Sequence, residues 1–175
     1  MAPLVLLAGV CAVTPIPALA VQVPESQVKA AFLINFAKFV EWPDAPSRSG
    51  KPLVIGLLGR DATGVALVTM AAGKVVSGRP LVLRHFTTIS EVSECDLLYV
   101  ARTESRRLPA VVEALKGRHV LTVSDHPEFA REGGMIAFRS GNRRVSFEVN
   151  PVAARGNGLI ISSQLLSVAV VVNGR

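Results

Sequence analysis

Cysteine is scarce in this chain, which has only two among its 175 residues, Cys11 and Cys95. Cys11 lies in an N-terminal stretch that we expect to be removed, so the mature chain would keep Cys95 alone. An internal disulfide is then excluded, and so is a small secreted fold stapled by disulfides. A single thiol at the head of the apolar run CDLLYVA is more typical of a buried, inert residue than of a reactive one.

Charged residues are also few, at 18% of the chain, whereas 50% of the residues are hydrophobic. This composition excludes an intrinsically disordered protein, and the length suits one domain with a sizeable core. The first 20 residues carry no charge and end in Ala18-Leu19-Ala20. This small-x-small pattern predicts a signal peptide at residues 1–20, cleaved after Ala20, and therefore an exported protein with a domain at residues 21–175. The alternative is an unusual N-terminus that is retained.

Motifs for catalysis and metal binding are missing from the sequence. His85, His119 and His126 have no zinc-ligand spacing with one another or with Cys95. Ser124, Asp125 and His126 have the residue types of a catalytic triad, but consecutive residues cannot adopt its geometry. We therefore expect no enzyme, no metal and no cofactor.

The formal net charge is +6, and all charged residues follow residue 20. A basic exported domain suits an acidic partner or an anionic surface. Because the chain has no basic helix and no aromatic-and-basic pattern, we do not expect it to bind nucleic acid.

Apolar segments of strand length alternate with helical patterns through the middle of the chain. Strands are predicted at residues 52–59, 79–86, 95–101 and 119–125, and helices at residues 61–73, 103–117 and 126–134. This alternation predicts an α/β fold, a three-layer sandwich in which helices flank a mostly parallel sheet. Residues 134–150 then predict a β-hairpin, and residues 151–175 a short turn and a final helix.

The stretch VKAAFLINFAKFVEWP, from Val28 to Pro43, holds three of the seven Phe residues. It predicts a helix that begins at Glu25 or Ser26 and ends at Pro43. This helix has more apolar surface than one core contact would cover, so either two sides are covered or one side meets a partner. The candidate partner or dimer residues on its outer side are Lys29, Ile34, Asn35 and Trp42.

Two further places are candidate sites. The hairpin carries Arg139, Arg143, Arg144, Glu148 and Asn150, which predict either a partner surface or a solvated hairpin. The loop with Gly59 and Arg60 follows a strand, where α/β folds often bind ligands, and is a candidate ligand crevice. A role for Gly59 in turn geometry is the simpler explanation. Glu91, Glu94 and Asp96 are expected in a solvated loop.

Five segments, taken in order, resemble the YfiR family of exported regulators. They are VKAAFLINFAKFVEWP, CDLLYVA, VLTVSDHPEFAREGGMIAF, RRVSFEVNPVAA and GLIISSQLLSVA. The resemblance covers the chain from about residue 27 to about residue 169. It implies a periplasmic α/β protein, often dimeric, that represses an inner-membrane diguanylate cyclase, YfiN, by binding its periplasmic domain. It also implies that an outer-membrane lipoprotein, YfiB, sequesters the repressor, so that cyclic di-GMP and biofilm formation rise.

The chain departs from this family in its cysteines. Members commonly carry disulfides, and Cys95 lies where one such cysteine is expected. Its usual partner position corresponds to Gly56 here, and a second pair near the end of the domain is absent. The resemblance therefore predicts a member without internal redox control. A small-molecule sensor that acts on another membrane partner is the alternative function.

Overall fold

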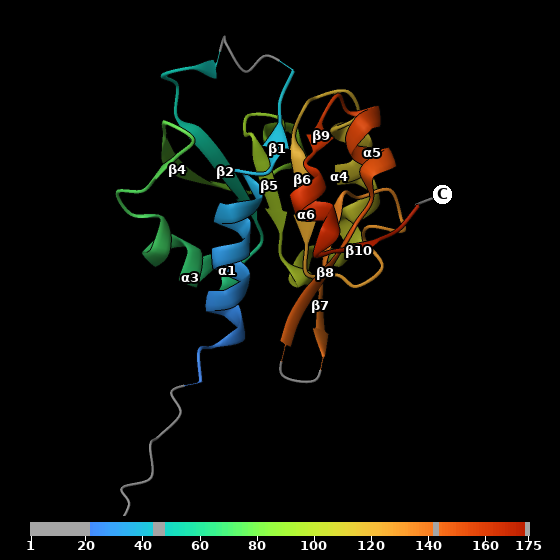
Figure 1. The fold of residues 1–175 in the computed structure, drawn as a ribbon, viewed down its shortest axis with the longest axis horizontal. Coiled ribbons are helices and arrows are strands. Elements are labelled where there is room, and N and C mark those ends of the chain that lie inside the picture. The colour runs from blue at the N-terminus through green and yellow to red at the C-terminus, as the bar shows by residue number, and fades with distance from the viewer. Residues whose placement is uncertain (1–21, 44–47, 142–143, 174–175) are drawn as a thin grey trace, which may run out of the picture.

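The computed structural model describes residues 22–43, 48–141 and 144–173. The predicted signal peptide and Arg143 lie outside the described residues. The helices and strands, shown in Figure 1, are α1 (Glu25–Phe36), β1 (Val40–Glu41), β2 (Leu53–Leu58), α3 (Ala62–Ala71), β3 (Val75–Val76), β4 (Arg79–Phe86), β5 (Leu97–Val100), α4 (Leu108–Ala114), β6 (Leu121–Ser124), β7 (Ile136–Gly141), β8 (Arg144–Val149), α5 (Pro151–Gly156), β9 (Ile160–Ile161), α6 (Ser163–Ser167) and β10 (Val170–Val171). Two 3-10 turns, η1 (Ile89–Glu91) and η2 (Arg102–Arg107), are also present among the described residues.

The main sheet has eight strands in the order β10-β8-β7-β6-β5-β2-β4-β3. The central strands β4, β2, β5, β6 and β7 are parallel to one another, and β10 is parallel to β8. The antiparallel pairs are β7 with β8, the predicted hairpin, and β3 with β4. The predicted mostly parallel sheet and its hairpin are therefore confirmed.

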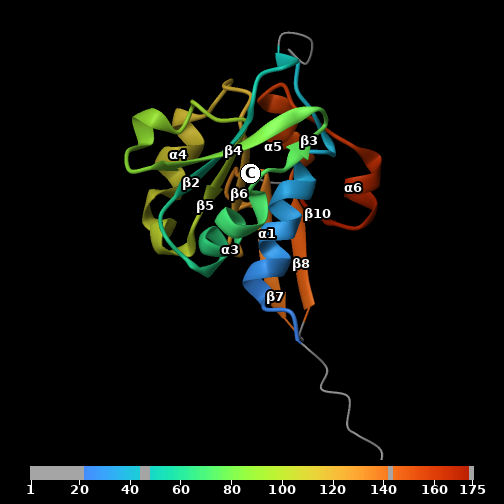
Figure 2. The same ribbon diagram turned by 90° about the vertical axis from the view of Figure 1, so that its left-hand side faces the viewer.

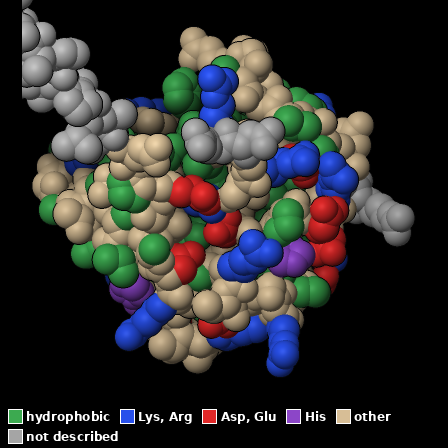
Figure 3. All heavy atoms as spheres, turned by 90° about the horizontal axis from the view of Figure 1, so that it is seen from below, with side chains coloured by type: hydrophobic (Ala, Val, Ile, Leu, Met, Phe, Trp, Pro, Cys, Tyr) green, Lys and Arg blue, Asp and Glu red, His purple; other side chains and the backbone are tan. Residues whose placement is uncertain are grey.

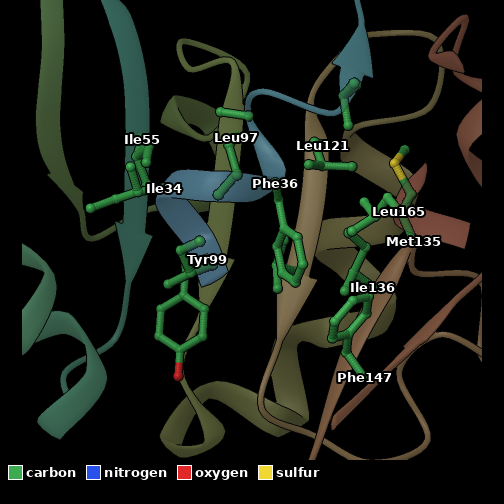
Figure 4. Packing of buried hydrophobic residues seen from close by; sticks show 14 of the residues in the cluster. Ile34, Phe36, Ile55, Leu97, Tyr99, Leu121, Met135, Ile136, Phe147 and Leu165 are labelled. Atoms are coloured by element: carbon green, nitrogen blue, oxygen red, sulfur yellow. The ribbon is translucent and has the colours of Figure 1, made fainter. Parts of the chain in front are cut away.

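Both faces of the sheet are covered, which confirms the three-layer arrangement. One core lies between the sheet and helices α1 and α3, and a second lies between the opposite face and α4. In the first core, Ile34 of α1 lies beside Ile55 of β2, and Phe36 lies between Tyr99 and Ile136 (Figure 4). The ring of Phe36 also stacks on Phe138, with 5.8 Å between the centroids. Burial of each such side chain contributes about 1.5–3 kcal/mol.

The first helix is shorter than the sequence predicts. It begins at Glu25, as expected, but it ends at Phe36 rather than at Pro43. Val40 and Glu41 form strand β1 instead, which pairs with Ile160–Ile161 of β9. A strand contributed from the far end of the chain has replaced the last turns of the helix, and no local pattern predicts that pairing.

The helix predicted at residues 103–117 is also shorter. Residues 102–107 form the 3-10 turn η2, and α4 begins only at Leu108. Pro109 lies in the first turn of α4, where a missing backbone N–H does no harm. Gly117 follows the helix with a φ of +69°, a conformation that glycine adopts readily at a helix end.

Two other predicted helices are wrong in detail. Residues 127–133 form turns rather than a helix, and the Ser124 hydroxyl accepts a hydrogen bond from the backbone N–H of His126. The C-terminal region contains two short helices, α5 and α6, rather than one. Strand β9 separates them, and strand β10 follows. Both strands are only two residues long, too short for a periodic pattern to reveal.

Candidate functional site

Charged side chains converge at the end of the molecule where the central parallel strands terminate. This end also holds the first turn of α1 and the outer part of the β7–β8 hairpin (Figure 1). Figure 3 views the molecule from this end and shows acidic and basic side chains intermixed over it. Parallel sheets commonly place their ligands at this edge, so its chemistry indicates what the fold can do.

The centre of this region is a polar cluster formed by Lys29, Glu25, Asp125 and Ser140. The Lys29 Nζ atom lies 2.6 Å from Asp125 Oδ1 and 2.5 Å from Glu25 Oε1. It also donates to Ser140 Oγ at 3.1 Å, and Ser140 in turn donates to Glu25. Lys29 is 3% exposed, although we expected it on an outer face. The cluster therefore joins α1 to the end of β6 and to the hairpin.

The contacts in this cluster shift the pKa values of Lys29 and Glu25 toward their charged forms. Burial alone would lower the pKa of the Lys29 ammonium, but its hydrogen bonds and charge interactions with Asp125 and Glu25 outweigh burial and raise it. The hydrogen bond from Lys29, followed by that from Ser140, lowers the pKa of Glu25. Lys29 is thus held as a cation with two carboxylate partners, an arrangement suited to holding elements together and not to nucleophilic chemistry.

A second buried contact lies beside this cluster. The Tyr99 hydroxyl of β5 donates to Asp61 Oδ2 at 2.6 Å. The other oxygen of Asp61 accepts from the backbone N–H of Gly64 and so caps α3. Burial, and next the bond to Asp61, raise the pKa of Tyr99. The phenol is therefore a neutral donor that fixes the start of α3 on the sheet.

The predicted crevice at Gly59 and Arg60 corresponds to a cavity of about 360 Å³ between α3 and β4. Its lining also includes Asp61, Val65, Val68 and His85. Gly59 has a φ of +85°, and a Cβ atom there would lie 2.6 Å from Glu104 Cγ. Turn geometry and the close approach of η2 thus account for this glycine. Whether the cavity binds a ligand stays a prediction.

The hairpin residues are not all on a solvated face. Glu148 is 1% exposed, and its Oε1 atom accepts from Arg139 at 2.6 Å and from Arg131 at 2.8 Å. Asn150 is also buried, donates to the Ala130 carbonyl and caps α5. These two residues were expected to be exposed. They are buried because the loop that carries Ala130 and Arg131 covers this part of β8. The sequence predicts a helix at these residues, so the covering loop was not expected. Arg139 and Arg144 remain exposed.

The outer side predicted for the first helix is also largely internal. Ile34 and Trp42 are 5% and 8% exposed, and both belong to the core that α1 shares with the sheet. Of the four residues chosen there, Asn35 alone is exposed. A charged residue at position 34 or 42 would therefore act on folding before it acted on any interface.

Cys95 is a free, buried thiol, as expected. Burial raises its pKa to about 12, so it has little thiolate character at neutral pH. A Cβ atom at Gly56 would lie 2.9 Å from Cys95 Sγ, so the two positions are adjacent. Burial of the thiol also disfavours a disulfide between the Cys95 residues of two chains.

Asp96, expected in a solvated loop, is buried at the opposite end of the sheet. One of its oxygens accepts from the Val54 backbone N–H and from Arg79, and the other contacts Arg48. This cluster ties the chain before β2 to the start of β5.

Metal and membrane sites were sought in the part of the chain that the structure describes. There, no group of three or more His, Cys, Asp or Glu side chains is arranged to hold a metal ion. No helix of these residues has the length and apolar character to span a membrane.

Comparison with one solved structure supports the fold. A crystal structure of a conserved domain protein from Vibrio cholerae O1 biovar El Tor has a TM-score of 0.57 and 13% sequence identity, and the match covers 84% of this chain. The match spans 60% of that longer protein. A ligand-free, open substrate-binding protein with adhesive properties from Clostridium difficile has a TM-score of 0.49 and 14% identity over 70% of this chain and 55% of its own. No curated protein matches the sequence.

The family comparison is more specific than the structural one. The sequence profile described as YfiR/HmsC-like matches residues 26–170, which include nearly all of α1 and every later element as far as the start of β10. The YfiR/HmsC-like family is one of periplasmic regulators of diguanylate cyclase signalling. The chain belongs to the YfiR/HmsC-like family.

Proposed function

We propose that this protein is a periplasmic, non-catalytic repressor of an inner-membrane diguanylate cyclase. It binds the periplasmic domain of a YfiN-like cyclase and lowers cyclic di-GMP and biofilm formation. The observation that carries the proposal is the family match over residues 26–170. We further propose that the repressor is a homodimer and that a YfiB-like outer-membrane lipoprotein sequesters it.

The chemistry of the sheet edge supports a binding role. At the position where α/β enzymes commonly place reactive groups, Lys29 forms ion pairs with Glu25 and Asp125. The Tyr99 phenol there donates a hydrogen bond to Asp61. Groups paired in this way stabilise a rigid surface, whereas catalysis needs groups that are free to exchange protons with a substrate.

The hairpin is the surface that we assign to the cyclase. Arg144 is exposed on β8, and Arg139 of β7 keeps a side chain that is 47% exposed. With a net charge of +6, the chain is suited to an acidic patch on the partner. Exposed charges at the periphery of an interface act mainly on the rate at which the two proteins associate and on the salt dependence of that rate.

Binding of the purified chain to the periplasmic domain of the host's cyclase tests this assignment. Arg144→Glu should weaken binding about tenfold or more at low salt, because it reverses a charge at the interface. Arg118→Glu, an equal charge change on an exposed residue after α4, is the matched control and should bind normally. Equal affinities for the two variants would remove the hairpin from the interface, and no binding by the wild type would contradict the proposed function.

A small-molecule sensor is the second candidate, and the cavity at Gly59 and Arg60 favours it. An anionic metabolite would suit the exposed Arg60 guanidinium. A ligand that binds only the folded state raises the melting temperature. A metabolite screen should then find a compound that stabilises the wild type and does not stabilise Arg60→Ala.

A further inference from the structure

Strand β4 has an open edge. The neighbouring strand β3 pairs only with its first two residues, Arg79 and Pro80, and Lys74 accepts one further bond from the Leu81 N–H. Backbone groups alternate in direction along a strand, so those of Leu83 and His85 point to the same side as Leu81. In the described part of the chain no strand pairs with that side of Leu83 and His85. Figure 2 looks directly at this edge, and no other ribbon crosses in front of β4.

Exposed apolar side chains flank this edge on both faces of the strand. Helix α3 contains no charged residue, and its Val65 and Val68 side chains are 70% and 48% exposed. Val82 of β4 is 38% exposed on the other face of the strand. Unpaired edges with apolar neighbours pair readily with another chain unless charge, proline or a covering segment prevents it, and the proline of β4, Pro80, lies in the part that β3 already covers.

Geometry restricts how a second strand can pair here. Because β3 occupies the edge at residues 79–81, an added strand can pair with residues 82–86 only. An antiparallel second copy of β4 satisfies this limit when the two-fold axis passes beside Arg84. Leu83 then lies opposite His85 of the second copy, and both residues already point their backbone groups outward. The two equivalent pairs exchange four hydrogen bonds.

The charges near the axis also suit a second copy. Arg84 donates to Glu94 at 3.1 Å, and their side chains are 52% and 61% exposed. At the axis, two Arg84 side chains alone would repel each other. Each brings its own Glu94, so two positive and two negative groups can alternate around the axis, and an interface between identical subunits needs self-complementarity of this kind.

We propose that the homodimer forms by antiparallel pairing of β4 with β4 of a second copy, which makes one continuous sheet across the two subunits. The α3 helices of the two subunits then lie on the same face of that sheet, where they cover Val65 and Val68. This proposal rests on the dimer suggested above and adds the surface that forms it. It also replaces the surface on α1, where Ile34 and Trp42 are internal.

His85→Pro tests the backbone pairing directly. The His85 N–H points away from β2, so proline removes a bond to the second copy and none within the subunit. His85→Ala is the matched control, since it also removes the imidazole but keeps the N–H. We expect light scattering and sedimentation to show a dimer for the wild type and for His85→Ala. The dissociation constant of the His85→Pro dimer should be higher by about tenfold or more.

Two further measurements cover the case in which His85→Pro fails to fold. Glu94→Gln removes a negative charge that, among the described residues, pairs with Arg84 alone, so the dimer should weaken about threefold and recover in high salt. In the wild type, hydrogen exchange at the Leu83 and His85 amides should slow as the protein concentration rises.

A monomeric wild type would overturn both the dimer and this interface. A dimer that Glu94→Gln leaves unchanged and whose Leu83 and His85 amides exchange at one rate at every concentration would overturn the interface alone. Repression of the cyclase is measured separately and stands or falls independently of either result.

Discussion

The ammonium group of Lys29 lies 2.6 Å from the carboxylate of Asp125, which is 96 residues away in the chain. This contact anchors the N-terminal helix to the end of strand β6. With Glu25 and Ser140, it also ties the helix to the hairpin that we assign to the cyclase. The stability of the folded protein and the position of the hairpin should therefore both depend on Lys29.

Replacement of Lys29 by methionine should lower the free energy of unfolding by about 2 kcal/mol. Removal of one member of a fully buried ion pair costs about 3–5 kcal/mol, and the partial exposure of Glu25 and Asp125 reduces that figure here. Lys116→Met, which breaks an exposed pair with Glu113, is the control and should cost less than about 0.5 kcal/mol. Urea unfolding of both variants makes the comparison. Equal losses would mean that the buried cluster contributes no more than a surface pair.

The same cluster predicts a dependence of stability on acid. The pKa of Glu25 is lowered in the folded protein from its ordinary value of 4.5. Its contribution is therefore complete above that ordinary value and is lost as the pH falls through the lowered one. The pKa of Lys29 is raised, so its contribution is complete below 10.5 and is lost only in strong alkali. Unfolding curves between about pH 5 and pH 2 should lose stability less steeply in Lys29→Met than in the wild type. Parallel slopes would exclude Glu25 as a source of the acid sensitivity.

Cys95 should be inert in the folded protein. With a thiol pKa of about 12, about one molecule in ten thousand carries the thiolate at pH 8, and the side chain is also buried. Ellman's reagent should label the native chain very slowly and the urea-unfolded chain at once. Rapid labelling of the native chain, or a dimer band on a non-reducing gel, would show that the thiol is accessible.

Gly56 leaves no room for a side chain. A Cβ atom there would lie 2.4 Å from the ring of Phe86 and 2.9 Å from Cys95 Sγ, so Gly56→Ala should destabilise the protein by about 1–3 kcal/mol. Gly64→Ala is the control, since its Cβ atom would make ordinary contacts inside helix α3 and should leave stability unchanged or raise it by up to about 1 kcal/mol. Thermal unfolding gives both values. If Phe86 blocks the added methyl group, the cost should shrink when Gly56→Ala is made in a Phe86→Ala background.

The sequence pattern predicts the strands and the layers well because their signals are local. Runs such as CDLLYVA and LTVSD are apolar enough to be read as buried strands, and Asp61 caps the helix that its own neighbours form. The first helix was also recognised, but its end was not. Its predicted last residues pair with β9, more than one hundred residues later, and they become a strand.

The polar sites were harder to predict because their partners are distant. The local sequence around Lys29 predicts a surface residue, because it does not show that Asp125 and Ser140 lie beside it. Glu148 alternates with apolar residues along β8 and therefore reads as solvated. It is buried because Arg131 and Arg139 neutralise it, and Arg131 comes from a loop that was expected to be a helix. Alternation along a strand identifies its two faces, but it does not tell whether a loop covers the polar one.

The measurement that tests the central claim most directly is the cellular concentration of cyclic di-GMP in the host strain with and without this gene. Deletion should raise it. The intact gene should restore the original concentration, and a version without residues 1–20 should not, because the repressor must reach the periplasm to contact the cyclase. An unchanged concentration after deletion, in conditions where the protein is made, would contradict repression of a diguanylate cyclase.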